Sequence, residues 1–186
     1  MGALDAGLIS PVTVGHDALV ADAAVLDALV TVELALVRAY GAVGLAPADA
    51  VESISAALRQ DDLVDLHALV DASVAGGNPV IPLVGALKDA VPEPSRVWVH
   101  RGATSQDVLD SALMFVAAEA VAQIGASLEV IERALESFAR NHRNEVGAAR
   151  TLTQHGVPTT VGLRAANWMR GIRRASKQLR ELTFPA

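Results

Sequence analysis

The chain has 186 residues, of which 52% are hydrophobic and 3% aromatic, and it contains no cysteine. This composition suits a globular core filled by Ala, Val and Leu, and it excludes a disulfide framework and thiolate chemistry. The net charge of -6 is uneven, because residues 1–100 carry four Lys/Arg against thirteen Asp/Glu, whereas residues 101–186 carry eleven against eight. The acidic first half argues against nucleic-acid binding by the whole chain.

Targeting and membrane segments are not evident in the sequence. No basic segment followed by an apolar run begins the chain, and no stretch of eighteen residues is free of charge. We therefore expect neither a signal peptide nor a membrane span. The lack of cysteine agrees with a cytoplasmic protein.

Residues 1–95 show the three- and four-residue apolar spacing of short helices. The stripe of the first of them contains Asp22 and Glu33 among mostly apolar residues. Asn78 is expected to be the N-cap of the last, with Pro79 as its first residue, and the proline-rich turn that begins at Pro92 ends it. The helices are expected over residues 17–40, 47–58, 62–75 and 79–91. Together they predict a helical N-terminal domain over residues 1–95.

From residue 104 onward the apolar spacing continues for much longer. It runs without a proline and predicts one helix from about Gln106 to Arg143, roughly 57 Å long. A second helix is expected after Thr159 or Thr160 as its cap. Helices this long bury their stripes only in a bundle, and two of them do not close one. With no alternation long enough for a sheet, the predicted class is all-α, and residues 96–186 are the start of an incomplete long-helix bundle domain.

The segment "HRGATSQD", residues 100–107, gathers polar side chains at the start of the long helix. Thr104 and Asp107, three residues apart, resemble a capping box. The unpaired amides of a helix N-terminus, with the hydroxyls of Thr104 and Ser105, are suited to hold a carboxylate, and His100 would add a donor. The segment is therefore either an elaborate helix start or half of a site for an anionic small molecule.

A second polar segment, "AARTLTQHGVPTTVG", spans residues 148–162 between the two long helices. It contains Arg150, Thr151, Gln154 and His155. A polar loop between helices is usually a simple connection, so by itself the segment indicates either a connection or a second half-site.

Three stretches resemble, in their order, the fumarase/aspartase/adenylosuccinate lyase superfamily: "GGNPVIPLVGALKDAV", "WVHRGATSQDVLDSAL" and "RTLTQHGVPTTVGLRAANW". Within it they look most like the 3-carboxy-cis,cis-muconate cycloisomerase branch. The resemblance implies a small helical N-terminal domain followed by a central bundle of very long helices. It also implies a homotetramer whose active sites combine segments of three subunits, which would account for the unfinished bundle.

The resemblance also implies which residues bind substrate. Thr104 and Ser105 would hold a substrate carboxylate, while Thr151 and Gln154 match the second motif and would contact substrate from another subunit. Asn78 lies where lyase relatives carry a His and is a weaker candidate. The full implied set is Asn78, His100, Thr104, Ser105, Gln106, Thr151 and Gln154.

The chain departs from the superfamily pattern in two ways. Many lyases have a His after the Thr of the second motif, where it acts as the general acid or supports it, but here Leu152 follows Thr151. We hypothesise that the acid is dispensable because the cycloisomerase leaving group, in the ring-opening direction, is a carboxylate that departs unprotonated. In addition, the loop that supplies the catalytic serine base is not found in the 186 residues. We therefore expect an N-terminal portion that is inactive by itself and contains no catalytic base.

The implied reaction converts the tricarboxylate 3-carboxy-cis,cis-muconate to 4-carboxymuconolactone, a step of protocatechuate breakdown in the beta-ketoadipate pathway. Its intermediate is an aci-carboxylate dianion, which donors around that carboxylate stabilise. No metal or other cofactor is expected, because no His/Asp/Glu grouping has ligand spacing. Two alternatives stay open: an adenylosuccinate-type C–N lyase, and a helical assembly module without chemistry.

Overall fold

The computed structural model describes residues 12, 14–60 and 63–185. The chain divides into two compact units, which are described separately below. The first unit comprises Met1–Ala118 and Phe184–Ala186, and the second comprises Glu119–Thr183. The domain division predicted at residue 95 stays a prediction.

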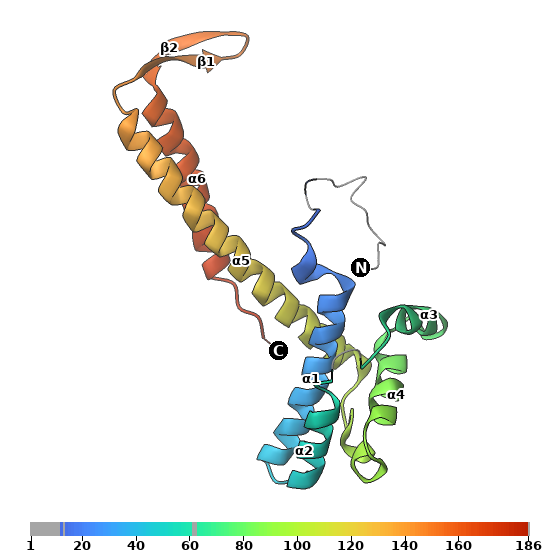
Figure 1. Ribbon diagram of the computed structural model, residues 1–186. Helices are drawn as coiled ribbons and strands as arrows, with labels where there is room; N and C mark the ends of the chain where they lie inside the picture. Colours follow the sequence, from blue (N-terminus) through green and yellow to red (C-terminus); the bar gives the residue numbers. More distant parts are fainter. Residues whose placement is uncertain (1–11, 13, 61–62, 186) are drawn as a thin grey trace. The chain divides into compact units, whose positions relative to one another are not determined.

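Short helices form most of the first unit (Figure 1). All the helices expected before residue 95 are present, each within a few residues of its predicted bounds, and the all-α fold class is confirmed. The elements are η1 (Ala18–Val20), α1 (Asp22–Ala42), α2 (Ala48–Ala57), α3 (Leu66–Gly76), α4 (Val80–Ala90), η2 (Glu93–Trp98) and the beginning of α5 (Ser105–Asn141).

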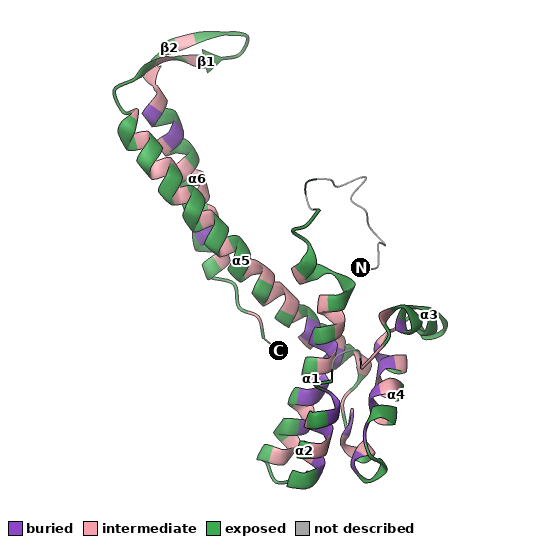
Figure 2. Ribbon diagram, viewed as in Figure 1, coloured by how far each residue is buried: buried purple, intermediate pink, exposed green. Residues whose placement is uncertain are grey.

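The core of the first unit is contributed mainly by α1, α2 and α4 (Figure 2). Full burial of a Leu or Ile side chain contributes about 1.5–3 kcal/mol, so a few such residues hold this small unit together. Glu33 of α1 is buried as completely as its apolar neighbours, which makes it an exception in this core. The apolar side chains with the lowest exposure include Leu29, Val37, Ile54, Leu83 and Leu87.

Helix α4 begins one residue later than predicted, so Asn78 precedes the N-cap position, yet its side chain still bonds to the first turn. Its side-chain Oδ1 accepts a hydrogen bond from the N–H of Val80 at 2.9 Å. Pro79, predicted as the first helical residue, occupies the N-cap position instead. Because proline lacks an N–H, Val80 offers the first amide that Asn78 can cap. The preceding helix α3 is followed at its C-cap by Gly77, whose φ of 60° lies in the left-handed region favoured for glycine.

The second unit pairs the rest of α5 with α6 (Val161–Arg180). The 37 residues of α5 match the predicted long helix, and at 1.5 Å per residue they span about 55 Å. The cap predicted for α6 is also confirmed, since the Thr160 hydroxyl accepts from the N–H of Leu163 at 3.1 Å. An ion pair at 2.5 Å joins Arg173 of α6 to Glu132 of α5.

The segment between these helices forms a β-hairpin, so the expectation of no strands was wrong here. Strands β1 (Val146–Thr151) and β2 (Gln154–Thr160) pair antiparallel. The register shifts between Ala148 and Arg150, and Thr153 at the turn has a φ of 62°. Most of the hairpin residues are exposed on both faces. The sequence therefore lacks the alternation of apolar and polar residues from which strands are predicted.

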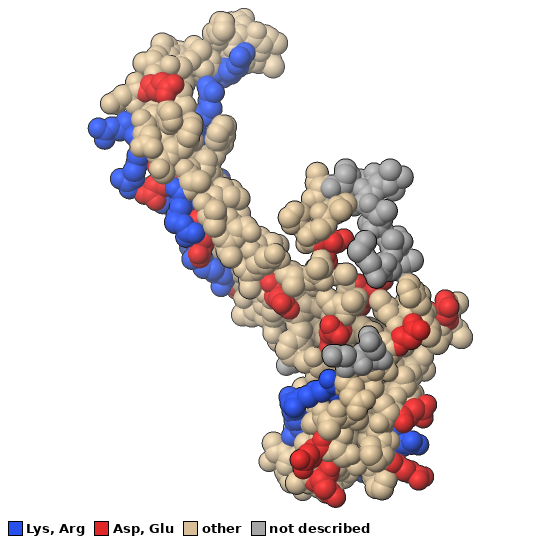
Figure 3. All heavy atoms as spheres, in the orientation of Figure 1, with Lys and Arg blue, Asp and Glu red and all other residues tan. Residues whose placement is uncertain are grey.

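Apolar and charged side chains share the exposed surface of the second unit. Large apolar residues of α5 are substantially exposed, among them Ile124, Val130 and Phe138. Figure 3 shows Lys and Arg along the α5–α6 segment, with acidic residues between them. By length and composition α5 is also able to cross a membrane. The same exposed stripe suits a helix of a larger bundle, and the predicted absence of a membrane span stays a prediction.

Candidate functional site

The turn between η2 and α5 contains two residues with left-handed backbone conformation. His100 has a φ of 56° and Gly102 a φ of 71°. Glycine adopts this region without steric cost, whereas a residue with a Cβ does so less readily. Contacts to α1 hold the turn, because the Tyr40 hydroxyl donates to the carbonyl oxygen of Arg101 at 2.5 Å. The Arg101 guanidinium lies 4.7 Å from the ring centre of Trp98.

Ser105 is the first residue of α5, and its Oγ accepts a hydrogen bond from Asn78 Nδ2 at 3.0 Å. Because Asn78 Oδ1 already accepts from the N–H of Val80, the orientation of the amide is determined by both bonds. Ser105 Oγ uses a lone pair in this contact, so its hydrogen is free to donate to a ligand. The structure thus brings together two of the predicted site residues from separate helix starts.

Thr104 and Gln106 flank Ser105 and are both exposed. The N–H of Thr104 donates to Asp107 Oδ2 at 3.0 Å, which is one half of the predicted capping box. Gln106 Nε2 donates to Asp110 Oδ1 at 2.7 Å along the same helix. An anion approaching this helix start would meet amides and hydroxyls, but it would also compete with the Asp107 carboxylate for the Thr104 amide.

His100 is held by a residue that the sequence did not assign to the site. Its Nδ1 lies 2.6 Å from Oε1 of Glu33, whose side chain is fully buried, while the His100 side chain is 18% exposed. The only signal for Glu33 in the sequence was a carboxylate within an apolar helical stripe. Such a position indicates a buried partner, but the spacing of residues cannot identify which one.

Thr151 and Gln154 lie in the second unit, at the tip of the hairpin. They are opposite each other in the strand register, with Leu152 and Thr153 as the turn between them. Both are exposed, and Leu152 is 88% exposed. The hairpin therefore presents the residues of the second motif to solvent at a projecting turn. Their predicted contact with substrate in another subunit stays a prediction.

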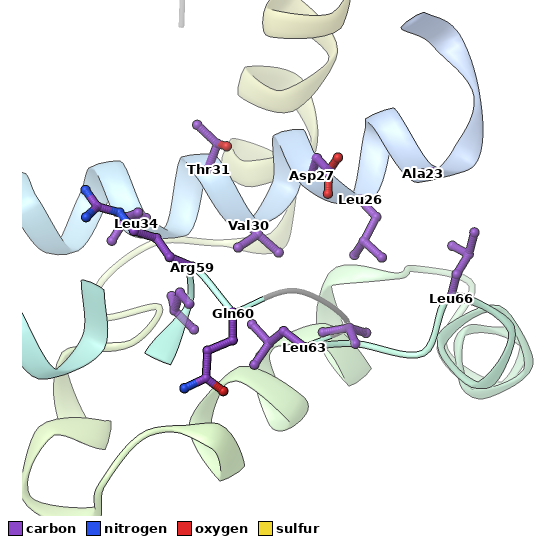
Figure 4. A pocket seen from close by; sticks show the side chains of 12 residues that line it. Ala23, Leu26, Asp27, Val30, Thr31, Leu34, Arg59, Gln60, Leu63 and Leu66 are labelled. Carbon is purple, nitrogen blue, oxygen red and sulfur yellow. The ribbon is translucent and has the colours of Figure 1, made fainter. Parts of the chain in front are cut away.

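A hollow of about 680 Å³ in the first unit has no predicted site residue in its lining (Figure 4). Leu26 and Val30 of α1 point toward the segment that carries Leu63. Arg59 and Gln60 add polar groups, and residues 61–62, which follow them in the sequence, lie outside the described part. Among the residues that the structure describes, no three His, Asp or Glu side chains gather as metal ligands. The expectation of a metal-free site stays a prediction.

Comparison with known proteins places these features in a family. The sequence pattern of the family described as "Lyase" matches residues 24–185. A nitrosuccinate lyase of Streptomyces davaonensis is 46% identical over 180 residues, which cover 94% of this chain and 38% of that protein. A 3-carboxy-cis,cis-muconate cycloisomerase of Bradyrhizobium diazoefficiens is 40% identical over 166 residues, covering 87% and 36%.

Solved structures agree with the sequence comparison. The crystal structure of β-carboxy-cis,cis-muconate cycloisomerase from Acinetobacter calcoaceticus superposes on 86% of this chain with a TM-score of 0.83 and 32% identity. The superposition covers 38% of that chain. The chain thus spans less than two fifths of the length of these relatives, and the resemblance found in its motifs is confirmed.

Proposed function

The chain belongs to the lyase family, and we propose that the protein containing it acts on a small polycarboxylate. The reaction makes or breaks a bond β to a carboxylate, through an intermediate with extra negative charge on that carboxylate. The observation that carries this proposal is Ser105, held by Asn78 at the N-terminus of α5 with its hydroxyl hydrogen free. Donors placed where charge develops lower the barrier most effectively.

The leaving group is one that departs as a stable anion. Leu152 occupies the place where many lyases carry the His of the general acid, and its apolar side chain cannot donate a proton. A carboxylate or a nitrite ion leaves without being protonated, whereas an amine or hydroxide gains from an acid. This argument disfavours the adenylosuccinate-type C–N lyase. The match to the lyase family over residues 24–185 likewise disfavours an assembly module without chemistry.

Two substrates meet this requirement. The lyase named for nitrosuccinate shares more identity with this chain, over more of its length, than the cycloisomerase does, and we place nitrosuccinate first. Its elimination would remove a proton from the carbon next to the one bearing the nitro group, giving fumarate and nitrite. The second candidate is 3-carboxy-cis,cis-muconate, as the motifs predicted, supported by the similarity to cycloisomerases in sequence and structure.

Several features of the complete enzyme are part of this proposal. Thr151 and Gln154 would contact substrate from another subunit of a homotetramer, and the serine base would lie outside these 186 residues. The isolated chain would then be inactive. The enzyme would be cytoplasmic and would use neither metal nor cofactor. The predicted N-terminal domain, residues 1–95, would supply Asn78 to the site.

The direct test is a turnover assay of the full-length protein with each substrate. Release of nitrite from nitrosuccinate and loss of the conjugated absorbance of 3-carboxy-cis,cis-muconate report the two reactions separately. We expect one of them to be catalysed, and Ser105→Ala to lower its kcat/KM at least tenfold, because a donor to the developing charge is lost. Unchanged turnover after replacing both Thr104 and Ser105 with alanine would refute the proposal.

A further inference from the structure

We propose that Glu33 is a positioning residue, which holds His100 with Nδ1 protonated and leaves Nε2 as the ring nitrogen that faces the substrate. The inference rests on the proposed function insofar as His100 lies in the substrate site. The pairing itself is a property of this chain and can be tested without a substrate.

Burial of Glu33 is the first observation. Its side chain has no exposed surface, and only Oε1 has a partner, since Oε2 makes no hydrogen bond among the described residues. A carboxylate with one oxygen unpaired is costly to bury, and an apolar residue would be cheaper at this position of the α1 stripe. Core packing therefore does not explain Glu33, whereas its contact with His100 does.

The proposal assigns the proton of this contact. With Glu33 ionised, Oε1 can only accept, and the hydrogen in the 2.6 Å contact then belongs to Nδ1 of His100. The second ring nitrogen, Nε2, is then the one available to a ligand. In a metal ligand or catalytic histidine, the bond made by one nitrogen similarly fixes the role of the other.

The backbone around His100 supports a positioning role. With a φ of 56°, His100 adopts a conformation that glycine would adopt at lower cost. Two residues of α1, seven positions apart and so on the same face, hold the turn: Glu33 at the ring of His100 and Tyr40 at the carbonyl of Arg101. Strained conformations persist where the surrounding contacts over-determine them, and they are concentrated at functional sites. Helix α1 therefore determines where His100 lies.

The first experiment reads the ring directly. The 186-residue chain is labelled with 15N-histidine, and long-range 1H–15N correlations, assigned with His100→Gln, report which nitrogen carries hydrogen. We expect Nδ1 of His100 to be protonated in the wild type and in Glu33→Gln, which keeps an acceptor oxygen. In Glu33→Met, which has similar volume but no acceptor, the Nδ1–H signature should be lost. A wild-type His100 with Nδ1 bare, or an unaltered signature in Glu33→Met, would overturn the inference.

The second experiment uses turnover by the full-length protein. Glu33→Met should lower kcat/KM at least tenfold while shifting Tm by only a few degrees, and Glu33→Gln should restore much of the loss. The matched control is Glu145→Gln, which alters another His–carboxylate pair, the exposed His142–Glu145 contact. It should leave both the His100 signature and turnover unchanged. If wild type turns over neither substrate, the proposed function fails, while the tautomer measurement still decides the role of Glu33.

Discussion

Asn78 and Ser105 lie 27 positions apart in the chain, and Nδ2 of the first donates a hydrogen bond to Oγ of the second at 3.0 Å. The bond connects the start of α4 with the start of α5. It also sets the direction of the Ser105 hydroxyl, because an oxygen that accepts from Asn78 has its own hydrogen free for another partner. We therefore expect Asn78 to act on a ligand through Ser105.

Reversing that hydrogen bond should weaken substrate binding with little loss of stability. In Asn78→Asp, one carboxylate oxygen can still cap Val80, but the other accepts from Ser105 and draws its hydrogen away from the ligand. We expect kcat/KM to fall by roughly tenfold or more, equivalent to about 1.4 kcal/mol, and Tm to change by a few degrees at most. Steady-state kinetics and thermal unfolding of the full-length protein measure the two effects.

A charge change alone provides the control for this variant. Asn144→Asp introduces the same charge at an exposed residue of the turn after α5. It should leave kcat/KM unchanged. Equal losses in both variants would mean that net charge, rather than the direction of the Ser105 hydroxyl, controls binding.

The turn before α5 should be sensitive to a methyl group at Gly102. An alanine there would keep a φ of 71° and would place Cβ 3.0 Å from the Tyr40 hydroxyl oxygen. The backbone conformation alone costs roughly 1–2 kcal/mol. Gly44→Ala is a matched control, because its φ is 74° and nothing lies within 4 Å of its Cβ.

Urea denaturation of the 186-residue chain separates backbone strain from contact. We expect both alanine variants to lower the free energy of unfolding, with Gly102→Ala losing more. Tyr40→Phe removes the hydroxyl. In the Tyr40→Phe background, Gly102→Ala should therefore lower the free energy of unfolding by less than it does in the wild type. Equal losses for Gly102→Ala and Gly44→Ala would show that the Tyr40 contact does not restrain the turn.

The sequence predicted the helices better than the contacts between them. Helix α5 was expected over about Gln106–Arg143 and is found at Ser105–Asn141, because a long apolar stripe repeats one local signal many times. The hairpin was missed because its residues are mostly exposed on both faces and carry no alternating pattern. Glu33 was placed on the stripe of its helix without any role, and its partner His100 lies 67 positions away, beyond the reach of any local pattern.

Gly162 should not tolerate a larger residue, because the backbone of α6 lies close to the backbone at the end of α5 there. A Cβ on Gly162, near the start of α6, would lie 2.5 Å from the carbonyl oxygen of Ala139 and 2.7 Å from the Cα of Arg143. Backbone atoms cannot rotate away as side chains do, so Gly162→Ala should destabilise the chain by about 1–3 kcal/mol or more. Gly171 lies in the same helix with nothing within 4 Å of its Cβ.

The matched variant Gly171→Ala should move stability in the opposite direction. Alanine in a helix interior is favoured over glycine by about 0.5–1 kcal/mol. Free energies of unfolding from urea denaturation, measured for both variants under one condition, should therefore have opposite signs relative to wild type. A Gly162→Ala variant as stable as Gly171→Ala would contradict the close approach of α6 to the end of α5.

The ion pairs of Glu136, with Arg140 in the same helix and with Arg173 of α6, should give the stability of the chain an acid-sensitive component. Arg140 lowers the pKa of Glu136 through a hydrogen bond and through its charge, and Arg173 lowers it further. A carboxyl whose pKa is lower in the folded state stabilises that state at pH values above its unfolded pKa. This contribution disappears as the pH falls through the folded-state value. Glu136→Gln, which does not titrate, should thus be less stable than wild type at neutral pH, and the difference should vanish in acid.

Thermal unfolding of both proteins between pH 7 and pH 3 tests this dependence. The Tm difference should narrow steadily below the ordinary glutamate pKa of 4.5. It should also shrink in high salt, since exposed charges are screened. Glu119→Gln, at an exposed position earlier in the same helix, removes an equal charge and should show a smaller pH dependence. A Tm difference for Glu136→Gln that stays constant from pH 7 to pH 3 would mean that the Glu136 charge does not stabilise the folded chain, despite its contacts with Arg140 and Arg173.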